Sequence, residues 1–281
     1  TVWNEPIQPE KGQIFQIYTV LSNQGLLPVE TNIILNQVNQ THINLDSGQS
    51  DTVLVAESFN DESGRFPYQI ATVTIGDYDE SNDSFLLHVN IPFDYHDVLI
   101  NEIMYDPLTG NPEWVEIENR LQSEISLFNW YIEDEDNYQS GQIVGGQSIL
   151  SLGRAVLGRE ENIPGMILQT GFPGLNNDSD NIFLFDHTGT MIDHVQYSSD
   201  WGGGDGFSLE RVTFFLDSNN PQNWGSCVDV MGNTAGEQNS LFIEEIETRG
   251  HVNCSPNPFT PNGDGSEDEL FVSYNMPFTQ I

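Results

Sequence analysis

Short stretches in which apolar and polar residues alternate recur along most of this chain of 281 residues. Residues 14–21 (IFQIYTVL), 69–75 (QIATVTI) and 84–91 (SFLLHVNI) are examples, and clusters of Gly, Ser, Asn and Asp separate such runs. Alternation of period two is typical of a strand with one buried face, and the polar clusters are typical of turns. A clean helical period of 3.6 is absent from every window of 11 or more residues. The sequence therefore predicts an all-β fold of antiparallel sandwiches.

The clearest hairpin signal lies at residues 181–197. Two apolar runs, NIFLF and MIDHVQY, flank a short connector that begins at His187 and reads HTGT. A connector of a few residues that contains glycine, placed between alternating runs, indicates a β-hairpin. We therefore expect two adjacent antiparallel strands here.

Three segments together resemble a known family. Residues 98–107 (VLINEIMYDP), 112–119 (PEWVEIEN) and 181–197 occur in the order typical of the lamin tail domain. This family is an immunoglobulin-like β-sandwich of nuclear lamins and of many secreted bacterial proteins. The resemblance extends over residues 98–239, and the glycine-rich loop 201–206 is its main departure. It implies a fold and no particular chemistry, because sandwich folds carry many unrelated functions.

The flanking regions resemble other immunoglobulin-like modules. Residues 1–95 resemble the CARDB-type adhesion modules of bacterial surface proteins in the turn motifs that separate their predicted strands. Residues 241–281 resemble the start of C-terminal domains in such proteins, some of which are sorting signals for type IX secretion. A complete sandwich needs roughly twice that length, so we expect the third domain to be truncated. The predicted architecture is thus a series of tandem immunoglobulin-like β-sandwiches.

The charge balance is strongly acidic. Seven basic residues stand against 43 acidic ones, which gives a formal net charge of −36 at pH 7. Such a surface repels phosphate backbones and anionic lipids, so we expect neither nucleic-acid binding nor membrane association. Membrane insertion is also not expected, because no stretch approaches the ~20 apolar residues of a spanning helix. The acidity favours solubility in a salty, divalent-rich medium, and specific cation binding is the alternative.

One acidic loop is a candidate calcium site. Asn262, Asp264 and Asp268 lie in the segment NGDGSED, and Ca²⁺ prefers six to eight oxygen ligands. Thr260 and Phe271 occupy the first and twelfth positions of an EF-hand register, so a full EF-hand is excluded. A looser Ca²⁺ site remains one interpretation, and an Asx-type turn before a strand is the other.

The two cysteines, Cys227 and Cys254, lack the CxxC spacing typical of zinc sites. In an exported protein they are candidates for a disulfide that would close a loop of about 26 residues. Two free thiols are the alternative.

The sequence contains only weak signals for catalytic residues. Glu102, Glu113, Glu116 and Glu118 invite comparison with the carboxylate pair of glycosidases. The strand period separates Glu113 from Glu116 and Glu118, so a pair is not favoured, and Glu116 is expected to accept a structural hydrogen bond. The pair His187 and His194 lacks a third ligand for zinc. The Gly-x-Ser-x-Gly signature of serine hydrolases is absent.

These observations predict a non-enzymatic extracellular or cell-surface module with a structural, adhesive or display role. The expected partners are other extracellular proteins, glycans or further domains of the same polypeptide. An accessory region of a larger secreted hydrolase or nuclease is the alternative, with positioning or substrate binding as its role. Carbohydrate binding would require exposed aromatic residues, for which Tyr138, Tyr197 and Trp201 are the candidates.

Overall fold

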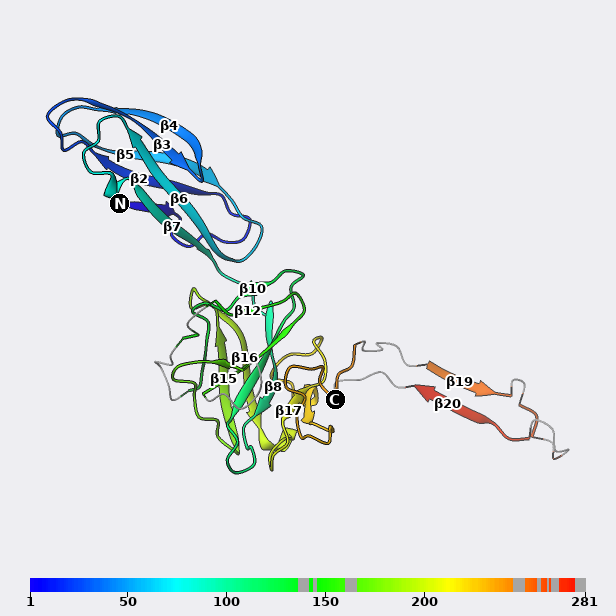
Figure 1. Cartoon of the computed structure of the whole chain (residues 1–281). Coiled ribbons are helices and arrows are strands. Elements are labelled where there is room, and N and C mark those ends of the chain that lie inside the picture. Colours follow the sequence, from blue (N-terminus) through cyan, green and yellow to red (C-terminus); the bar gives the residue numbers. More distant parts are fainter. Residues whose placement is uncertain are drawn as a thin grey trace.

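The structure is a computed structural model, and it describes residues 1–135, 142–143, 146–159, 166–244, 251–256, 259–261, 263 and 268–275. In that part of the chain all regular elements are strands or short 3₁₀ turns. Figure 1 shows two β-sandwiches followed by a two-stranded hairpin. The predicted all-β class with tandem immunoglobulin-like sandwiches is confirmed. None of the described helical segments is long and apolar enough to cross a membrane.

The first domain is a sandwich of two antiparallel sheets. One sheet has the order β1-β2-β5 and the other has the order β4-β3-β6-β7. The strands are β1 (Val2–Glu5), β2 (Phe15–Ser22), β3 (Val29–Leu35), β4 (Val38–Leu45), β5 (Ser50–Ser58), β6 (Gly64–Thr74) and β7 (Ser84–Ile91), with a 3₁₀ turn η1 (Glu80–Asn82). Alternate residues such as Phe15 and Ile17 on β2, and Ile33 on β3, point inward and are fully buried.

The second domain packs a six-stranded sheet against a three-stranded one. The larger sheet has the order β14-β13-β9-β8-β17-β18, and the smaller has β11-β15-β16. Its strands are β8 (Val98–Met104), β9 (Trp114–Asn119), β10 (Ile125–Ser126), β11 (Tyr131–Glu133), β12 (Ser148–Ile149), β13 (Arg154–Gly158), β14 (Ile167–Leu168), β15 (Ser179–Phe185), β16 (Met191–Ser198), β17 (Leu209–Arg211) and β18 (Trp224–Ser226). Strands β10 and β12 form a small separate pair, and η2 (Ser199–Trp201) and η3 (Pro221–Asn223) are short turns.

The predicted hairpin at residues 181–197 is confirmed as β15 and β16, which pair in antiparallel register. Asp186 stabilises its turn, because its carboxylate accepts hydrogen bonds from the N–H groups of Thr188 at 2.7 Å and Thr190 at 3.0 Å. The turn therefore depends on Asp186 as well as on Gly189, the glycine on which the hairpin prediction relied.

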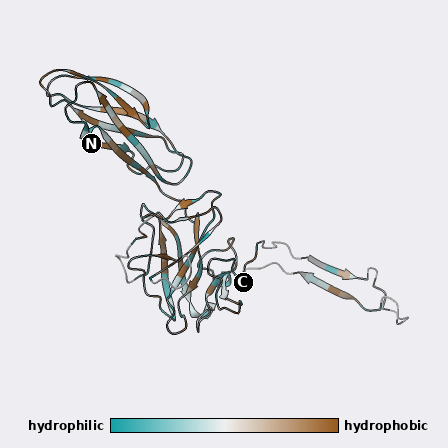
Figure 2. Cartoon of the chain, in the orientation of Figure 1, coloured by the Kyte–Doolittle hydropathy of each residue, from teal (hydrophilic) through white to brown (hydrophobic). Residues whose placement is uncertain are grey.

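Strands β8 and β9 are buried on both faces, and every residue of each strand is buried. Inward residues such as Ile100, Val115 and Ile117 belong to the core between the two sheets. Figure 2 shows hydrophobic stretches along the strands of both domains. Since the outer face of β8 and β9 is also covered, the polar residues on that face must find partners inside the protein.

The last described strands, β19 (His251–Ser255) and β20 (Phe271–Asn275), form an antiparallel hairpin. Between the first two domains, the Lys11 ammonium lies 3.3 Å from the carboxylate of Asp94 and 3.9 Å from that of Asp97. The Arg65 guanidinium lies 4.7 Å from the centroid of the Phe128 ring. These contacts connect the first domain to the second beyond the covalent linker.

Candidate functional site

Three glutamates form a row across neighbouring strands of the six-stranded sheet. The strand register pairs Glu116 of β9 with Glu102 of β8, and Glu102 with Glu210 of β17. Their neighbours Val115 and Leu209 belong to the core, so strand alternation directs the three carboxylates to the opposite face. All three glutamates are nevertheless fully buried. A row of buried carboxylates is costly unless each is hydrogen-bonded.

Residues 232–241, named here the strap, supply those hydrogen bonds. Each carboxylate accepts from a different N–H of the strap: Thr234 donates to Glu102 at 2.9 Å, Gly236 to Glu116 at 2.5 Å and Leu241 to Glu210 at 3.0 Å. The strap lies close to the domain, because a Cβ on Gly232 would fall 2.6 Å from the carbonyl oxygen of Gly206. The three glutamates are thus the hydrogen-bond acceptors for one backbone segment.

Side chains complete the attachment. Asn101 and Asn239 form a reciprocal pair, in which each amide donates to the other's oxygen, at 2.8 Å and 3.2 Å. The Asn239 amide also donates to the carbonyl oxygens of Asn101 and Arg211, both at 2.9 Å. The hydroxyl of Ser240 donates to Glu210 at 2.7 Å. Strap and sheet are therefore joined by a network in which buried polar groups satisfy one another.

Burial raises the pKa of two glutamates of the row, Glu102 and Glu116. Desolvation raises the pKa of Glu102 to about 7, although hydrogen bonds from Ser208 and Thr234 oppose the shift. Desolvation raises the pKa of Glu116 to about 8, against the opposing hydrogen bonds from Gly236 and Asn101. A large fraction of these two groups therefore carries a proton near neutral pH. Nowhere in the described part of the chain do three His, Cys, Asp or Glu side chains form a group able to hold a metal.

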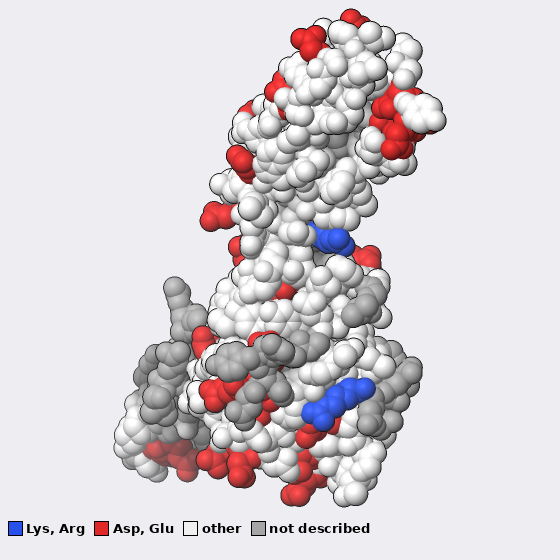
Figure 3. Space-filling view, turned by 90° about the vertical axis from the view of Figure 1, so that its left-hand side faces the viewer, with Lys and Arg blue, Asp and Glu red and all other residues white. Residues whose placement is uncertain are grey.

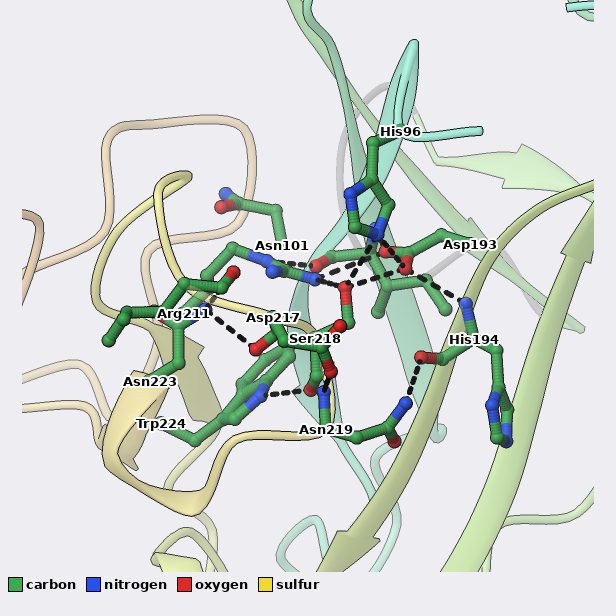
Figure 4. A network of polar contacts seen from close by, with 12 residues as sticks. His96, Asn101, Asp193, His194, Arg211, Asp217, Ser218, Asn219, Asn223 and Trp224 are labelled. Carbon is green, nitrogen blue, oxygen red and sulfur yellow. Dashed lines mark hydrogen bonds and ion pairs between the residues drawn. The ribbon is translucent and has the colours of Figure 1, made fainter. Parts of the chain in front are cut away.

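A second polar network lies near the start of β16, around Asp193, and is drawn in Figure 4. The Arg211 guanidinium is nearly fully buried and lies 3.1 Å from the carboxylate of Asp193. It also donates to the carbonyl oxygen of Ile100 at 2.7 Å and to the hydroxyl of Ser218 at 2.9 Å. The Trp224 ring centroid lies 4.9 Å from its central carbon. Arg211 therefore joins several segments that are distant in the sequence.

Burial raises the pKa of Asp193, but the Arg211 charge and hydrogen bonds from His96, Ser218 and Ile100 outweigh it and hold the pKa below its ordinary value. Serine, histidine and aspartate meet here, yet the geometry is not that of a catalytic triad. Ser218 donates directly to Asp193 at 2.6 Å, and both residues approach the same histidine nitrogen, Nε2 of His96, at 3.4 Å and 3.3 Å. A triad needs the two ring nitrogens to serve different partners.

The other predicted candidates are placed apart. Glu113 accepts a hydrogen bond from the N–H of Leu175 at 3.1 Å. The His194 ring stacks on Phe183 at 4.4 Å between centroids, whereas His187 makes an edge contact with Phe93 at 6.0 Å. Each group is thus engaged locally. The prediction that Glu116 accepts a structural hydrogen bond is confirmed.

The calcium prediction falls largely outside the described residues, to which Asn262 and Asp264 do not belong. Asp268 is described, and its carboxylate accepts a hydrogen bond from the N–H of Gly263 at 2.6 Å. The site stays a prediction.

Both cysteines are free, so the structure does not form the expected disulfide. Cys227 is buried in the second domain, with the Ser240 hydroxyl 3.7 Å from its sulfur, whereas Cys254 is exposed on β19.

The three aromatic candidates for carbohydrate binding do not form an exposed row. Tyr197 is fully buried, and its hydroxyl donates to the carbonyl oxygen of Asn176 at 2.6 Å. Trp201 packs partly buried against the core, and Tyr138 lies outside the described residues. Tyr197 therefore cannot belong to an exposed aromatic row, because the alternation of β16 directs its side chain inward.

Sequence reasoning missed Glu210, Arg211, Asp193 and Asn239 as buried polar residues. The available signal was weak: glutamates alternate with large apolar residues in VEIE and LER, a pattern that solvent-facing strand residues also produce.

Residues 92–199 match the family model described as Lamin Tail Domain. No curated protein matches the chain. Among solved structures, a DUF4876 family protein from Bacteroides thetaiotaomicron is 10% identical over 79% of this chain and 98% of that one, with a TM-score of 0.35. The transglutaminase of red sea bream is 9% identical over 70% of this chain, with a TM-score of 0.29. The E. coli chaperone DraB is 9% identical over 70% of this chain and 98% of its own, with a TM-score of 0.22.

The chain spans 29% of the length of the transglutaminase. These structural likenesses are too loose to support an argument about function. The family match covers the core strands of the second domain and stops before the strap. Residues 92–199 of this chain are thus a segment of the lamin tail type, with an immunoglobulin-like fold.

Proposed function

We propose that this chain is a non-enzymatic extracellular module that spaces, displays or attaches other domains at a bacterial cell surface. The observation that carries this proposal is the use of the buried polar groups in the second domain. The glutamate row and Arg211 bind backbone groups of distant segments, including the strap that leads out of the domain. Such an arrangement fits a domain built to hold its exit segment in place.

The junction between the first two domains supports the same role. Lys11 is the only lysine of the chain, and it forms its ion pairs with Asp94 and Asp97 at the linker. Arg65 stacks on Phe128 of the second domain. Contacts of this kind favour a restricted angle between sandwiches in series, which suits a spacer. In this proposal the first domain is an adhesion module of the CARDB type, and β19 and β20 open a further immunoglobulin-like domain.

Mechanical unfolding of the full chain between handles at its two ends tests the proposal. A load-bearing spacer should give one cooperative rupture for each sandwich, and the variant E102A/E116A/E210A should lower the rupture force of the second domain alone. Gradual extension without cooperative ruptures would contradict a spacer role. An unchanged rupture force in the triple variant would show that the strap does not contribute to the mechanical stability of the second domain.

A further inference from the structure

The strap lies against an apolar cluster on the outer face of the larger sheet. The cluster consists of Met104, Trp114, Val156 and Met166, which are between 3% and 7% exposed. Ala235 is the strap residue that packs against it. A single methyl group buries little apolar surface, so we attribute closure of the strap mainly to its hydrogen bonds with the glutamate row.

One hydroxyl of the strap contacts two carboxyl groups of the row. Oγ1 of Thr234 lies 2.8 Å from Oε1 of Glu210 and 3.1 Å from Oε2 of Glu102. A threonine hydroxyl has a single proton, so it donates to one of these oxygens only. If both carboxyl groups were ionised, the other contact would join two buried acceptors without a proton between them. The contact geometry thus requires a proton on one of the two carboxyl groups.

The position of Glu102 assigns this proton to it. Glu102 lies in the middle of the row, so a negative charge on it is repelled by Glu116 on one side and by Glu210 on the other. Glu210 lies at the end of the row and accepts three further hydrogen bonds, which favour its charged form. The donors are the hydroxyl of Ser240 at 2.7 Å, the N–H of Leu241 at 3.0 Å and the thiol of Cys227. Oε2 of Glu102 therefore donates to the Thr234 hydroxyl, which donates in turn to Glu210.

The surrounding charges do not replace this proton. The charged and titratable groups around Glu102 are Glu116 and Glu118 of β9, Arg120 after it, Arg154 of β13, Glu210 of β17, Cys227 after β18 and Glu237 of the strap. Both arginines pair with Glu118 at 2.9 Å, and Arg154 also lies 3.7 Å from Glu116, on the far side of that glutamate from Glu102. Figure 3 shows acidic atoms on the surface of both sandwiches, whereas the row is buried.

We propose that the strap is a proton-dependent latch, closed while a proton on Glu102 joins the row to Thr234 and open once that proton is lost. After the loss, the charges of Glu102 and Glu210 repel each other across a hydroxyl that can serve only one of them. Opening returns the carboxylates to water and uncovers Met104 and Trp114. The inference rests on the proposed role of the second domain in holding its exit segment, and it adds the condition under which that segment is released.

The latch opens as the pH rises. Burial raises the pKa of Glu102 in the closed state to about 7, above the ordinary value of 4.5. Its contribution to closure is therefore fully present below about pH 4.5 and is lost as the pH rises through about 7. The pKa of Glu116, which burial raises to about 8, acts in the same direction. The strap is thus favoured closed at about pH 6 and favoured open at about pH 8.5.

Hydrogen exchange of the full chain at about pH 6 and about pH 8.5 tests the latch. After correction for the intrinsic exchange rate at each pH, the protection factors of the Thr234, Gly236 and Leu241 amides should fall at least about tenfold at the higher pH. The amides of β15 and β16 should then remain at least about tenfold better protected than those of the strap. This difference separates release of the strap from unfolding of the whole domain.

Methionine oxidation by hydrogen peroxide gives a second readout. Met104 is 4% exposed in the cluster beside the strap, whereas Met231 is 76% exposed and reports the reactivity of an open site. The rate of sulfoxide formation at Met104, divided by that at Met231, should rise at least about fivefold over the same pH interval. An unchanged ratio would contradict the uncovering of the cluster.

Two pairs of variants locate the proton. E102Q places an amide donor beside Thr234 at every pH, so its strap should stay protected at about pH 8.5. The matched variant E237Q removes an exposed charge of the strap and should behave as the native chain. T234V removes the hydroxyl between the two carboxyl groups and should lower the protection of the strap at about pH 6, whereas T234S keeps the hydroxyl and should preserve it.

The outcomes separate the latch from the proposed function. Equal protection of the native strap at the two pH values, or a fall in E102Q as large as in the native chain, would overturn the latch and leave the spacer role intact. Fast exchange of the strap at both pH values would overturn the latch together with the holding of the exit segment.

Discussion

The two sandwiches bury their strands in different ways. In the first domain β6 alternates between exposed and buried positions, and Val73 keeps 52% of its surface exposed. In the second domain β8 and β9 are buried along their whole length. The first domain therefore needs only one apolar face per sheet, whereas the second needs partners for two faces.

In the second domain, backbone N–H donors cover the outer face of the larger sheet, which carries acidic side chains. The outer face of the larger sheet presents Glu102, Glu116 and Glu210, and the strap covers it with N–H donors instead of apolar side chains. Hydrogen bonds to buried carboxylates hold the cover in place, at the cost of a strong dependence on partner geometry. Among the described residues of the first domain no segment covers a sheet in this way, and an open cleft lies between its two sheets.

The largest expected effect is the loss of a buried charge in the second domain, compared with the loss of an exposed charge in the first. R211M removes a buried guanidinium and leaves Asp193 buried without its cation, which should cost about 3–5 kcal/mol of the free energy of unfolding of the second domain. R65M, at the exposed junction, should change the first domain by less than about 1 kcal/mol. Urea unfolding followed by amide signals of each domain checks both values. Similar losses in the two variants would contradict the difference.

The next effect tests whether the domains unfold independently. Ile33 is fully buried in the core of the first domain, and I33A should lower its stability by about 2–4 kcal/mol through lost burial and a cavity. The same urea experiment should show an unchanged midpoint for the second domain. A parallel shift of both midpoints would show that the junction couples the two cores.

A pH effect should appear in the second domain alone. The folded pKa values of Glu102 and Glu116, about 7 and about 8, lie above the ordinary glutamate pKa of 4.5. The stability from these groups is fully present below about pH 4.5 and is lost as the pH rises through the folded values. From pH 6.5 to 8.5, above the range where His187 and His194 titrate, the second domain should lose about 3 kcal/mol of its free energy of unfolding.

The double variant E102Q/E116Q removes both titrations and should flatten this dependence. Asp193 does not interfere, because its lowered pKa affects stability only at acid pH. If the second domain of the native chain is equally stable at pH 6.5 and 8.5, Glu102 and Glu116 are not protonated as described.

The smallest effect concerns the junction. K11M removes the ion pairs to Asp94 and Asp97, which are partly exposed, so each domain should change by less than about 1 kcal/mol. The readout is the spread of interdomain orientations, measured by residual dipolar couplings. We expect a broader spread than in the native chain, and an unchanged spread would assign the restriction to the linker alone.

Local patterns predicted much of the fold. The alternation around the HTGT connector predicted β15 and β16, and the strand period placed Glu116 and Glu118 on one face of β9, opposite the core residues Val115 and Ile117. The glutamate row was not predictable, because Glu210 lies 108 positions after Glu102 and a buried glutamate in a strand has the same pattern as an exposed one. The strap has no periodicity, so its partners follow only from the tertiary structure. Tyr197 was a candidate for carbohydrate binding, but its side chain points into the core from β16, a direction that its position at the end of an apolar run did not reveal.

Hydrogen exchange of the strap tests the central claim most directly. The N–H groups of Thr234, Gly236 and Leu241 should exchange with protection close to that of β9, and E102A/E116A/E210A should remove this protection while leaving β15 and β16 protected. If these three amides exchange in the native chain as fast as those of an exposed loop such as residues 76–79, the glutamate row does not hold the strap, and the account is contradicted.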